Sequence, residues 1–337
     1  MDTTVMLNKL INRKNLTSHE TELFLLEIIN GTINNAQTGA VLTALQMKGE
    51  TTDEIYGFIK AMRKNMIRVY IDQAIDVCGT GGDQKGTFNI STATAFVVAG
   101  AGVKVVKHGG RAVSSRSGSA DVMEKLGINI QLSAQQAELI FYKTGMVFLL
   151  APLFHPAMKQ VALIRKELKI RTIFNFIGPF TSPASVKRQL IGVPNIGIAE
   201  KLAKVGKELS YKKLLIVTSE DGMDEISTHS KTIVFEINKD KIKKMIIDPK
   251  EFGFKKFDKK EIICGTVADS AQIIKNILNG IKGPPRDLVI FNSAFALYVG
   301  GAVTNVKEGI KVAENSIDSG KAKLVLENLI KETQKYE

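Results

Sequence analysis

Residues 76–127 read DVCGTGGDQKGTFNISTATAFVVAGAGVKVVKHGGRAVSSRSGSADVMEKLG, a stretch in which glycines, hydroxyl side chains and cations interrupt short apolar segments. A largely apolar run from Ala74 to Cys78 predicts a buried strand that ends in the loop GTGGD at 79–83. Glycine has no Cβ, so such a loop exposes backbone N–H groups that can bind an anion. This first loop indicates a phosphate site.

Two further element ends in the same stretch have this character. The sequence NIST at 89–92 precedes a helix predicted over 93–101, which places hydroxyls and unpaired N–H groups at a positive helix N-terminus. A strand over 103–106 then leads into Lys107 and His108, followed by a serine-rich segment and a helix that stops at Gly127. Open α/β sheets bind ligands at the carboxyl ends of their strands, so the three loops together predict one phosphate-binding site. Neither the Walker A nor the G-x-G-x-x-G spacing occurs, which disfavours an ordinary nucleotide or dinucleotide site.

Length and composition bound the class of protein. The 337 residues predict one large or two unequal domains, and 44% hydrophobic with 24% charged residues is typical of a soluble globular protein. No apolar run is long enough for a membrane span and no signal peptide is visible, so we expect a cytoplasmic protein without a membrane partner. The two cysteines are too few for a disulfide framework or a metal cluster.

The net charge of +12 raises the alternative of nucleic-acid binding. Many of the lysines lie in 239–260, where they alternate with acidic and apolar residues, as on a solvated face. No RNA-binding or zinc-finger signature occurs, so a nucleic-acid partner is disfavoured.

The order of patterns along the chain predicts the fold class. Residues 1–67 look wholly helical, with capping boxes at 17–20 and 51–54. From Ile71 onward short strands alternate with helices, which predicts an α/β fold with a mainly parallel sheet. Later strands are expected at 190–193, 214–218, 232–235 and 244–247, and later helices at 156–167, 196–209, 268–278, 293–299 and 306–317.

Four motifs, GTGGD, NISTA, KHG-x-RAVSS-x-SGSAD and GMDE, together with RKELKIRTIFNFIGPFTSPA at 165–184, resemble the anthranilate phosphoribosyltransferase family. Its members join anthranilate to phosphoribosyl pyrophosphate (PRPP) in tryptophan biosynthesis, and the resemblance runs nearly end to end. It implies a fold of the nucleoside phosphorylase/phosphoribosyltransferase type. A small discontinuous helical domain (1–67 and 156–184) would pack beside a large α/β domain (71–155 and 185–337), with the substrates between them and a homodimer formed through the small domain.

The resemblance also implies the site. PRPP would contact Gly79, Gly82, Asp83, Thr87, Asn89, Ile90, Ser91, Thr92, Lys107, Ser115 and Ser119. Glycine N–H groups, hydroxyls and an ammonium all suit pyrophosphate oxygens. Asp83 is an unusual neighbour for an anion, and we expect it to orient the loop or to reach a ribose hydroxyl or a metal-bound water. Mg²⁺, expected as two ions, would be held by Ser91, Asp224 and Glu225, since hard cations prefer oxygen ligands. No residue is assigned as a certain acid or base; Lys107 and the metal would stabilise the transition state.

The acceptor side is implied to comprise Gly79, His108, Gly110 and Arg165. The planar fork of Arg165 suits the anthranilate carboxylate, and the ring of His108 could stack on an aromatic substrate. Position 110 departs from the family pattern KHGNR, because glycine replaces the asparagine that contacts anthranilate. This difference leaves open a related transferase with another aromatic or nucleobase acceptor. The charge of +12 leaves a nucleic-acid-binding relative of the same fold as a further alternative.

Overall fold

The computed structural model describes residues 2–111, 118–156, 158–255 and 257–336. At its centre is a seven-stranded sheet of order β3-β2-β1-β4-β5-β6-β7. The strands are β1 (Ile75–Gly79), β2 (Val105–Gly109), β3 (Met146–Leu150), β4 (Arg188–Gly192), β5 (Lys213–Ser219), β6 (Thr232–Asn238) and β7 (Lys241–Ile247). The first five in this order pair in parallel, whereas β6 and β7 are antiparallel. The predicted α/β class with a mainly parallel sheet is therefore confirmed.

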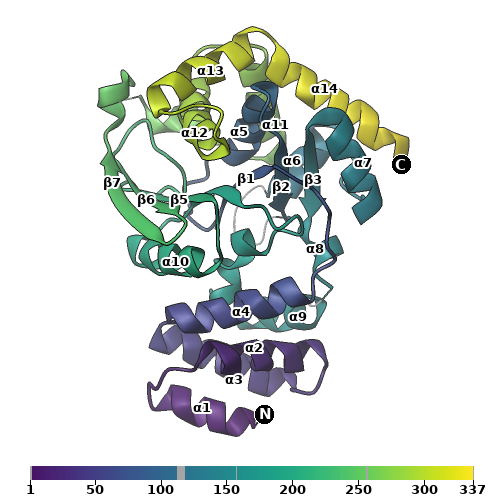
Figure 1. The fold of residues 1–337 in the computed structure, drawn as a ribbon, viewed down its shortest axis with the longest axis vertical. Coiled ribbons are helices and arrows are strands. Elements are labelled where there is room, and N and C mark those ends of the chain that lie inside the picture. The colour runs from purple at the N-terminus through teal and green to yellow at the C-terminus, as the bar shows by residue number, and fades with distance from the viewer. Residues whose placement is uncertain (1, 112–117, 157, 256, 337) are drawn as a thin grey trace.

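The sheet is covered on both faces, and the alternation of side chains along β5 shows how (Figure 1). Leu214 and Ile216 belong to an apolar core shared with the N-terminal helices and α10 (Ile196–Glu208), while Leu215 and Val217 belong to a second core on the opposite face. This second core contains α5 (Ile90–Gly100) and α12 (Pro284–Gly300). Successive side chains of a strand point to opposite faces, so a strand buried on both sides reads as a continuous apolar run.

Several element boundaries differ from the sequence-based prediction. Helix α12 begins at Pro284, well before the expected 293, because its two prolines occupy the first helical positions, where their missing N–H groups cost nothing. The pattern analysis did not assign α7 (Ala134–Thr144), β3 or α14 (Lys321–Thr333). The remaining helices around the large core are α6 (Ser119–Lys125), α11 (Val267–Leu278) and α13 (Val306–Asp318).

The N-terminal helices gather at one end of the molecule (Figure 1). They are α1 (Thr3–Ile11), α2 (Ser18–Ile29), α3 (Asn35–Lys48) and α4 (Thr52–Lys64). The chain returns to them after β3, through α8 (Ala151–Phe154) and α9 (Met158–Leu168), and α9 packs against α2 and α3. The 3₁₀ turn at Gly178–Thr181 then contacts α4. None of the helices in the described ranges is both long and apolar enough to span a membrane.

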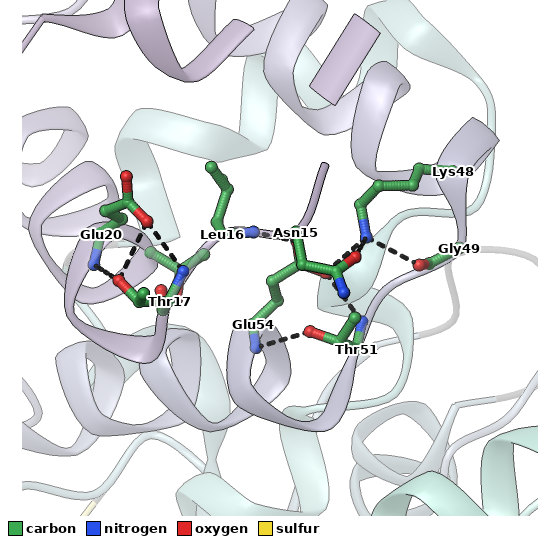
Figure 2. Close-up of polar contacts among 9 residues, drawn as sticks. Asn15, Leu16, Thr17, Glu20, Lys48, Gly49, Thr51 and Glu54 are labelled. Atoms are coloured by element: carbon green, nitrogen blue, oxygen red, sulfur yellow. Dashed lines mark hydrogen bonds and ion pairs between the residues drawn. The ribbon is translucent and has the colours of Figure 1, made fainter. Parts of the chain in front are cut away.

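Both predicted capping boxes are present, and one of them is buried (Figure 2). The fully buried carboxylate of Glu54 accepts hydrogen bonds from Thr51 N at 2.7 Å, Leu16 N at 2.9 Å and Lys48 Nζ at 2.9 Å. The ammonium of Lys48 also donates to Asn15 Oδ1 at 3.1 Å. This ion pair therefore joins the α1–α2 connection to the α3–α4 connection.

We predict that Glu54→Ala lowers the free energy of unfolding by about 3–5 kcal/mol, because it leaves the Lys48 ammonium buried without a counter-charge. Glu20 is the matched control: it closes the equivalent box, accepting from Thr17 N at 2.8 Å, but its partner Lys9 is 40% exposed. Glu20→Ala is expected to cost only about 0.5–2 kcal/mol. Urea unfolding followed by circular dichroism measures both losses, and equal losses would contradict a special contribution from the buried pair.

Candidate functional site

A cavity of about 660 Å³ opens at the carboxyl ends of the central strands. β1 lies between β2 and β4, where the strand order reverses direction, which is the usual binding position in open α/β sheets. Loops after β1, β2 and β5 form one side of the cavity, and the segment from Arg165 to Pro179 contributes the other.

The cavity brings together nearly all the predicted site residues. Those that line it are Gly79, Gly82, Asp83, Thr87, Asn89, Ile90, Ser91, Lys107, His108, Gly110, Ser119, Arg165, Asp224 and Glu225. Thr92 does not line the cavity. Its side chain is fully buried, and its hydroxyl donates to Asn89 Oδ1. Ser115 lies outside the described residues.

The glycine loop after β1 is held at both of its ends. At the start, Thr80 N donates to Gly192 O at 2.8 Å and Gly81 N donates to Asp224 Oδ2 at 2.7 Å. At the far end, Phe88 N donates to Ile262 O at 3.0 Å. Between these points the backbone turns through Gly81 and Gly82 with φ of +71° and +77°, which favours glycine at both positions.

Asp224 comes so close to two strand ends that only glycine fits there. A Cβ added to Gly79 would overlap the Asp224 carboxylate, and one added to Gly192 would overlap the Asp224 backbone carbonyl. These two glycines are paired in register across β1 and β4. The β5 loop is therefore seated directly on the carboxyl ends of its neighbours.

Asp83, Asp224 and Glu225 line a recess of the cavity in which their charges interact. Loss of hydration, together with the negative charge of Asp83, raises the pKa of Asp224 to about 7. Loss of hydration and the charge of Asp224 raise the pKa of Glu225 well above its usual range, against the opposing effect of Lys107. The described residues include no group of three or more His, Cys, Asp or Glu side chains that could hold a metal ion by themselves. Any cation here would need oxygen ligands from a substrate or from water.

Lys107 supplies a buried positive charge in the wall of the cavity. Its side chain projects from β2, and Nζ donates to Val77 O at 2.7 Å and to Ser91 Oγ at 3.0 Å. Burial lowers its pKa, while the negative charges of Asp76 and Glu225 oppose this effect. The ammonium thus connects β1, β2 and the first turn of α5.

His108 and His155 form a buried neutral pair beside the cavity, with ring centroids 5.2 Å apart. Burial lowers the pKa of His155 to about 4, and burial together with the neighbouring His155 lowers the pKa of His108 well below its usual range. Within the described residues, His108 Nε2 has no hydrogen-bond partner. A ligand in the cavity would therefore face a neutral imidazole.

The structure describes Gly110, the position that raised the question of the acceptor, and its neighbour Arg111. Gly110 does not adopt a positive φ, and a Cβ added there meets no atom of the described residues within 4 Å. Its neighbour Arg111 pairs with Asp121 at 3.0 Å and with Glu124 at 2.8 Å, so its charge is neutralised by α6. Neither the backbone geometry nor crowding by the part of the chain that the structure describes requires glycine at position 110.

Arg165 lies on α9 at the other side of the cavity, with its guanidinium carbon 5.6 Å from the ring centroid of Phe174. Partial burial lowers its pKa. Five further lining residues of the same segment were not predicted from the sequence, namely Arg171, Phe174, Asn175, Gly178 and Pro179. They lie within the stretch 165–184 that carries the family resemblance, but their spacing gives no helix or strand period that would assign them to the site.

Comparisons with known proteins show the family to which the chain belongs. Residues 71–323 match the glycosyl transferase family, a/b domain, and residues 5–66 match the glycosyl transferase family, helical bundle domain. The chain is 46% identical over 330 residues to an anthranilate phosphoribosyltransferase of Alkaliphilus metalliredigens, and the match covers 97% of each chain.

Solved structures give the same result. The anthranilate phosphoribosyltransferase of Thermus thermophilus superimposes with a TM-score of 0.90 at 33% identity, covering 98% of this chain and 99% of that one. The enzyme from Saccharomyces cerevisiae in complex with PRPP and Mg has a TM-score of 0.91 at 30% identity, covering 99% and 98%. Sequence and fold therefore agree that this chain belongs to the anthranilate phosphoribosyltransferase family.

Proposed function

We propose that this chain transfers the phosphoribosyl group of PRPP to anthranilate, giving N-(5-phosphoribosyl)anthranilate and pyrophosphate, in tryptophan biosynthesis. One observation carries the proposal: a buried ammonium, a glycine loop and paired carboxylates converge on one cavity. The relatives named above and the PRPP complex of the yeast enzyme support it.

The reaction breaks the bond between the ribose anomeric carbon and pyrophosphate. Positive charge develops on the sugar and negative charge on the leaving group, so the protein has to stabilise the latter. Lys107 would do this, and the hydrogen bonds from its ammonium to Val77 O and Ser91 Oγ support this role because they leave little to reorganise. The remaining predicted PRPP contacts, Gly79, Gly82, Asp83, Thr87, Asn89, Ile90, Thr92, Ser115 and Ser119, stay predictions.

Mg²⁺ fits the donor set of the recess. Magnesium is commonly bound through one or two carboxylates together with substrate phosphates and water, which Asp224, Glu225 and the hydroxyl of Ser91 allow. When bound, it would neutralise charge on the pyrophosphate. We propose that two Mg²⁺ ions bind to each subunit.

The acceptor would enter on the side of Arg165 and His108. The arginine fork can bind the anthranilate carboxylate, and the neutral His108 ring can lie against the aromatic acceptor without adding a second charge. The aniline nitrogen then attacks the anomeric carbon, and its proton leaves after the bond forms. Positioning is therefore the main task of this side.

We propose that the substrates bind in a cleft between two unequal domains. Residues 1–67 and 156–184 form the helical domain, and 71–155 and 185–337 form the α/β domain, with the cavity lined from both. The packing of α9 on α2 and α3 supports this division. We also propose that the chain forms a homodimer through the helical domain and that it is located in the cytoplasm.

We expect purified protein to form phosphoribosylanthranilate from anthranilate, PRPP and Mg²⁺, monitored by the change in anthranilate fluorescence.

The double change Asp224→Asn and Glu225→Gln should leave the fold intact and remove most of the Mg²⁺-dependent rate, because the carboxylates that hold the metal are neutralised. An unchanged dependence of the rate on Mg²⁺ would show that these acids do not hold it. Tight binding of RNA or DNA at physiological salt without turnover would favour the nucleic-acid alternative.

Gly110→Asn tests the acceptor. A Cβ at this position meets no atom of the described residues, and one net hydrogen bond from the amide, of about 0.5–1.5 kcal/mol, corresponds to a two- to tenfold lower KM for anthranilate. Gly110→Ala is the matched control, since it adds a Cβ without a hydrogen-bonding group and should leave KM unchanged. Equal KM values for both variants would show that position 110 does not contact anthranilate, and Gly110 would then no longer support the alternative of another aromatic acceptor.

A further inference from the structure

Arg171 makes a contact across the cavity that the proposed reaction does not yet use. It lies between α9 and the 3₁₀ turn Ile173–Asn175, on the same segment as Arg165. Its Nη1 donates to Gly82 O at 3.0 Å and its Nη2 donates to Gly81 O at 3.2 Å. The guanidinium therefore bridges from the acceptor side of the cavity to two consecutive carbonyls of the glycine loop.

The contact is close and occupies the face of the loop. A Cβ added to Gly82 would lie 2.7 Å from both terminal nitrogens of Arg171, so the guanidinium packs directly against the Gly82 α-carbon. Among the described residues Arg171 forms no ion pair, and its two hydrogen bonds both go to this loop. Arg171 therefore binds the glycine loop and not a carboxylate.

The contact also determines the direction in which the next N–H groups of the loop point. Carbonyl and N–H groups of one planar trans peptide point in opposite directions. When Arg171 turns the Gly81 and Gly82 carbonyls toward itself, the N–H groups of Gly82 and Asp83 must point away from it. Within the described part of the chain neither N–H has an acceptor, and both residues line the cavity.

The other face of the loop is fixed by Asp224, which accepts from Gly81 N at 2.7 Å. The loop is thus held from two sides, by an anion on one and a cation on the other. Adjacent unpaired N–H groups in such a turn form an anion-binding concavity. Without Arg171, the flexible Gly81–Gly82 unit could rotate and present carbonyl oxygens to the cavity instead.

We propose that Arg171 is a positioning residue for the pyrophosphate group of PRPP, acting by orienting the Gly82 and Asp83 N–H groups and not by binding the phosphates itself. The inference rests on the proposed function. It also implies that the donor subsite is fixed from the acceptor side, since Arg165 and Arg171 belong to one short segment.

The test combines kinetics with a measurement made without ligand. Arg171→Ala should raise the KM and the Kd for PRPP about 4- to 100-fold, since two hydrogen bonds are lost at roughly two- to tenfold each. The KM for anthranilate at saturating PRPP should change less than about twofold. Hydrogen exchange of the peptide covering residues 79–88, in the absence of ligand, should accelerate because Thr80 and Gly81 lose their protection. Arg171→Lys, with a single compact donor group, should recover part of both effects.

The matched control is Lys166→Ala, which removes an exposed cation from the end of α9 and should change neither readout. Circular dichroism and melting temperature check that all variants fold. A raised KM for PRPP with unchanged ligand-free exchange would overturn the proposal, because Arg171 would then bind the phosphates directly. An equal rise of both KM values, or no change in either, would also overturn it. If the unmodified protein does not bind PRPP, the proposed function itself fails, and this is seen before any variant is made.

Discussion

The buried ammonium of Lys107 is the constraint on which the site depends. A charge that is 1% exposed has to be compensated, because its desolvation costs several kcal/mol. Two hydrogen bonds and two nearby acids supply the compensation, and they come from β1, α5 and the β5 loop. The strand ends must therefore lie within a narrow range of positions. A site built around such a charge is already organised for an anion when the anion arrives.

The second constraint is the approach of the β5 loop to the strand ends. Gly79 and Gly192 leave the space that Asp224 fills, and Asp224 in turn holds the glycine loop through Gly81 N. A side chain at either glycine would move the acid and, through it, the loop. The same small set of residues thus determines both the backbone packing and the position of the carboxylates.

The sequence predicted the fold class and the loops that line the cavity because both leave local signals. Capping boxes at Thr17 and Thr51, apolar runs such as 214–218, and glycines next to hydroxyls all follow from backbone chemistry within a few residues. Arg171 could not be predicted in this way. Its role depends on a contact with Gly81 and Gly82 that are far away in sequence, and an arginine after a helix is usually a solvated charge. Likewise, the neutral state of His155 arises from burial that no periodicity around it reveals.

Strand β7 forms one edge of the sheet, and the residues on it affect the solubility of the protein. β7 pairs only with β6 among the described strands, and its outer edge exposes a backbone that could recruit a strand from another molecule. Ile246 on this strand is 62% exposed, which would add an apolar attraction to such pairing. Lys241, Lys243 and Lys244 lie along the same strand, and all three are exposed. Two such edges brought together would align like charges, so part of the lysine excess that the reaction does not need opposes edge-to-edge aggregation.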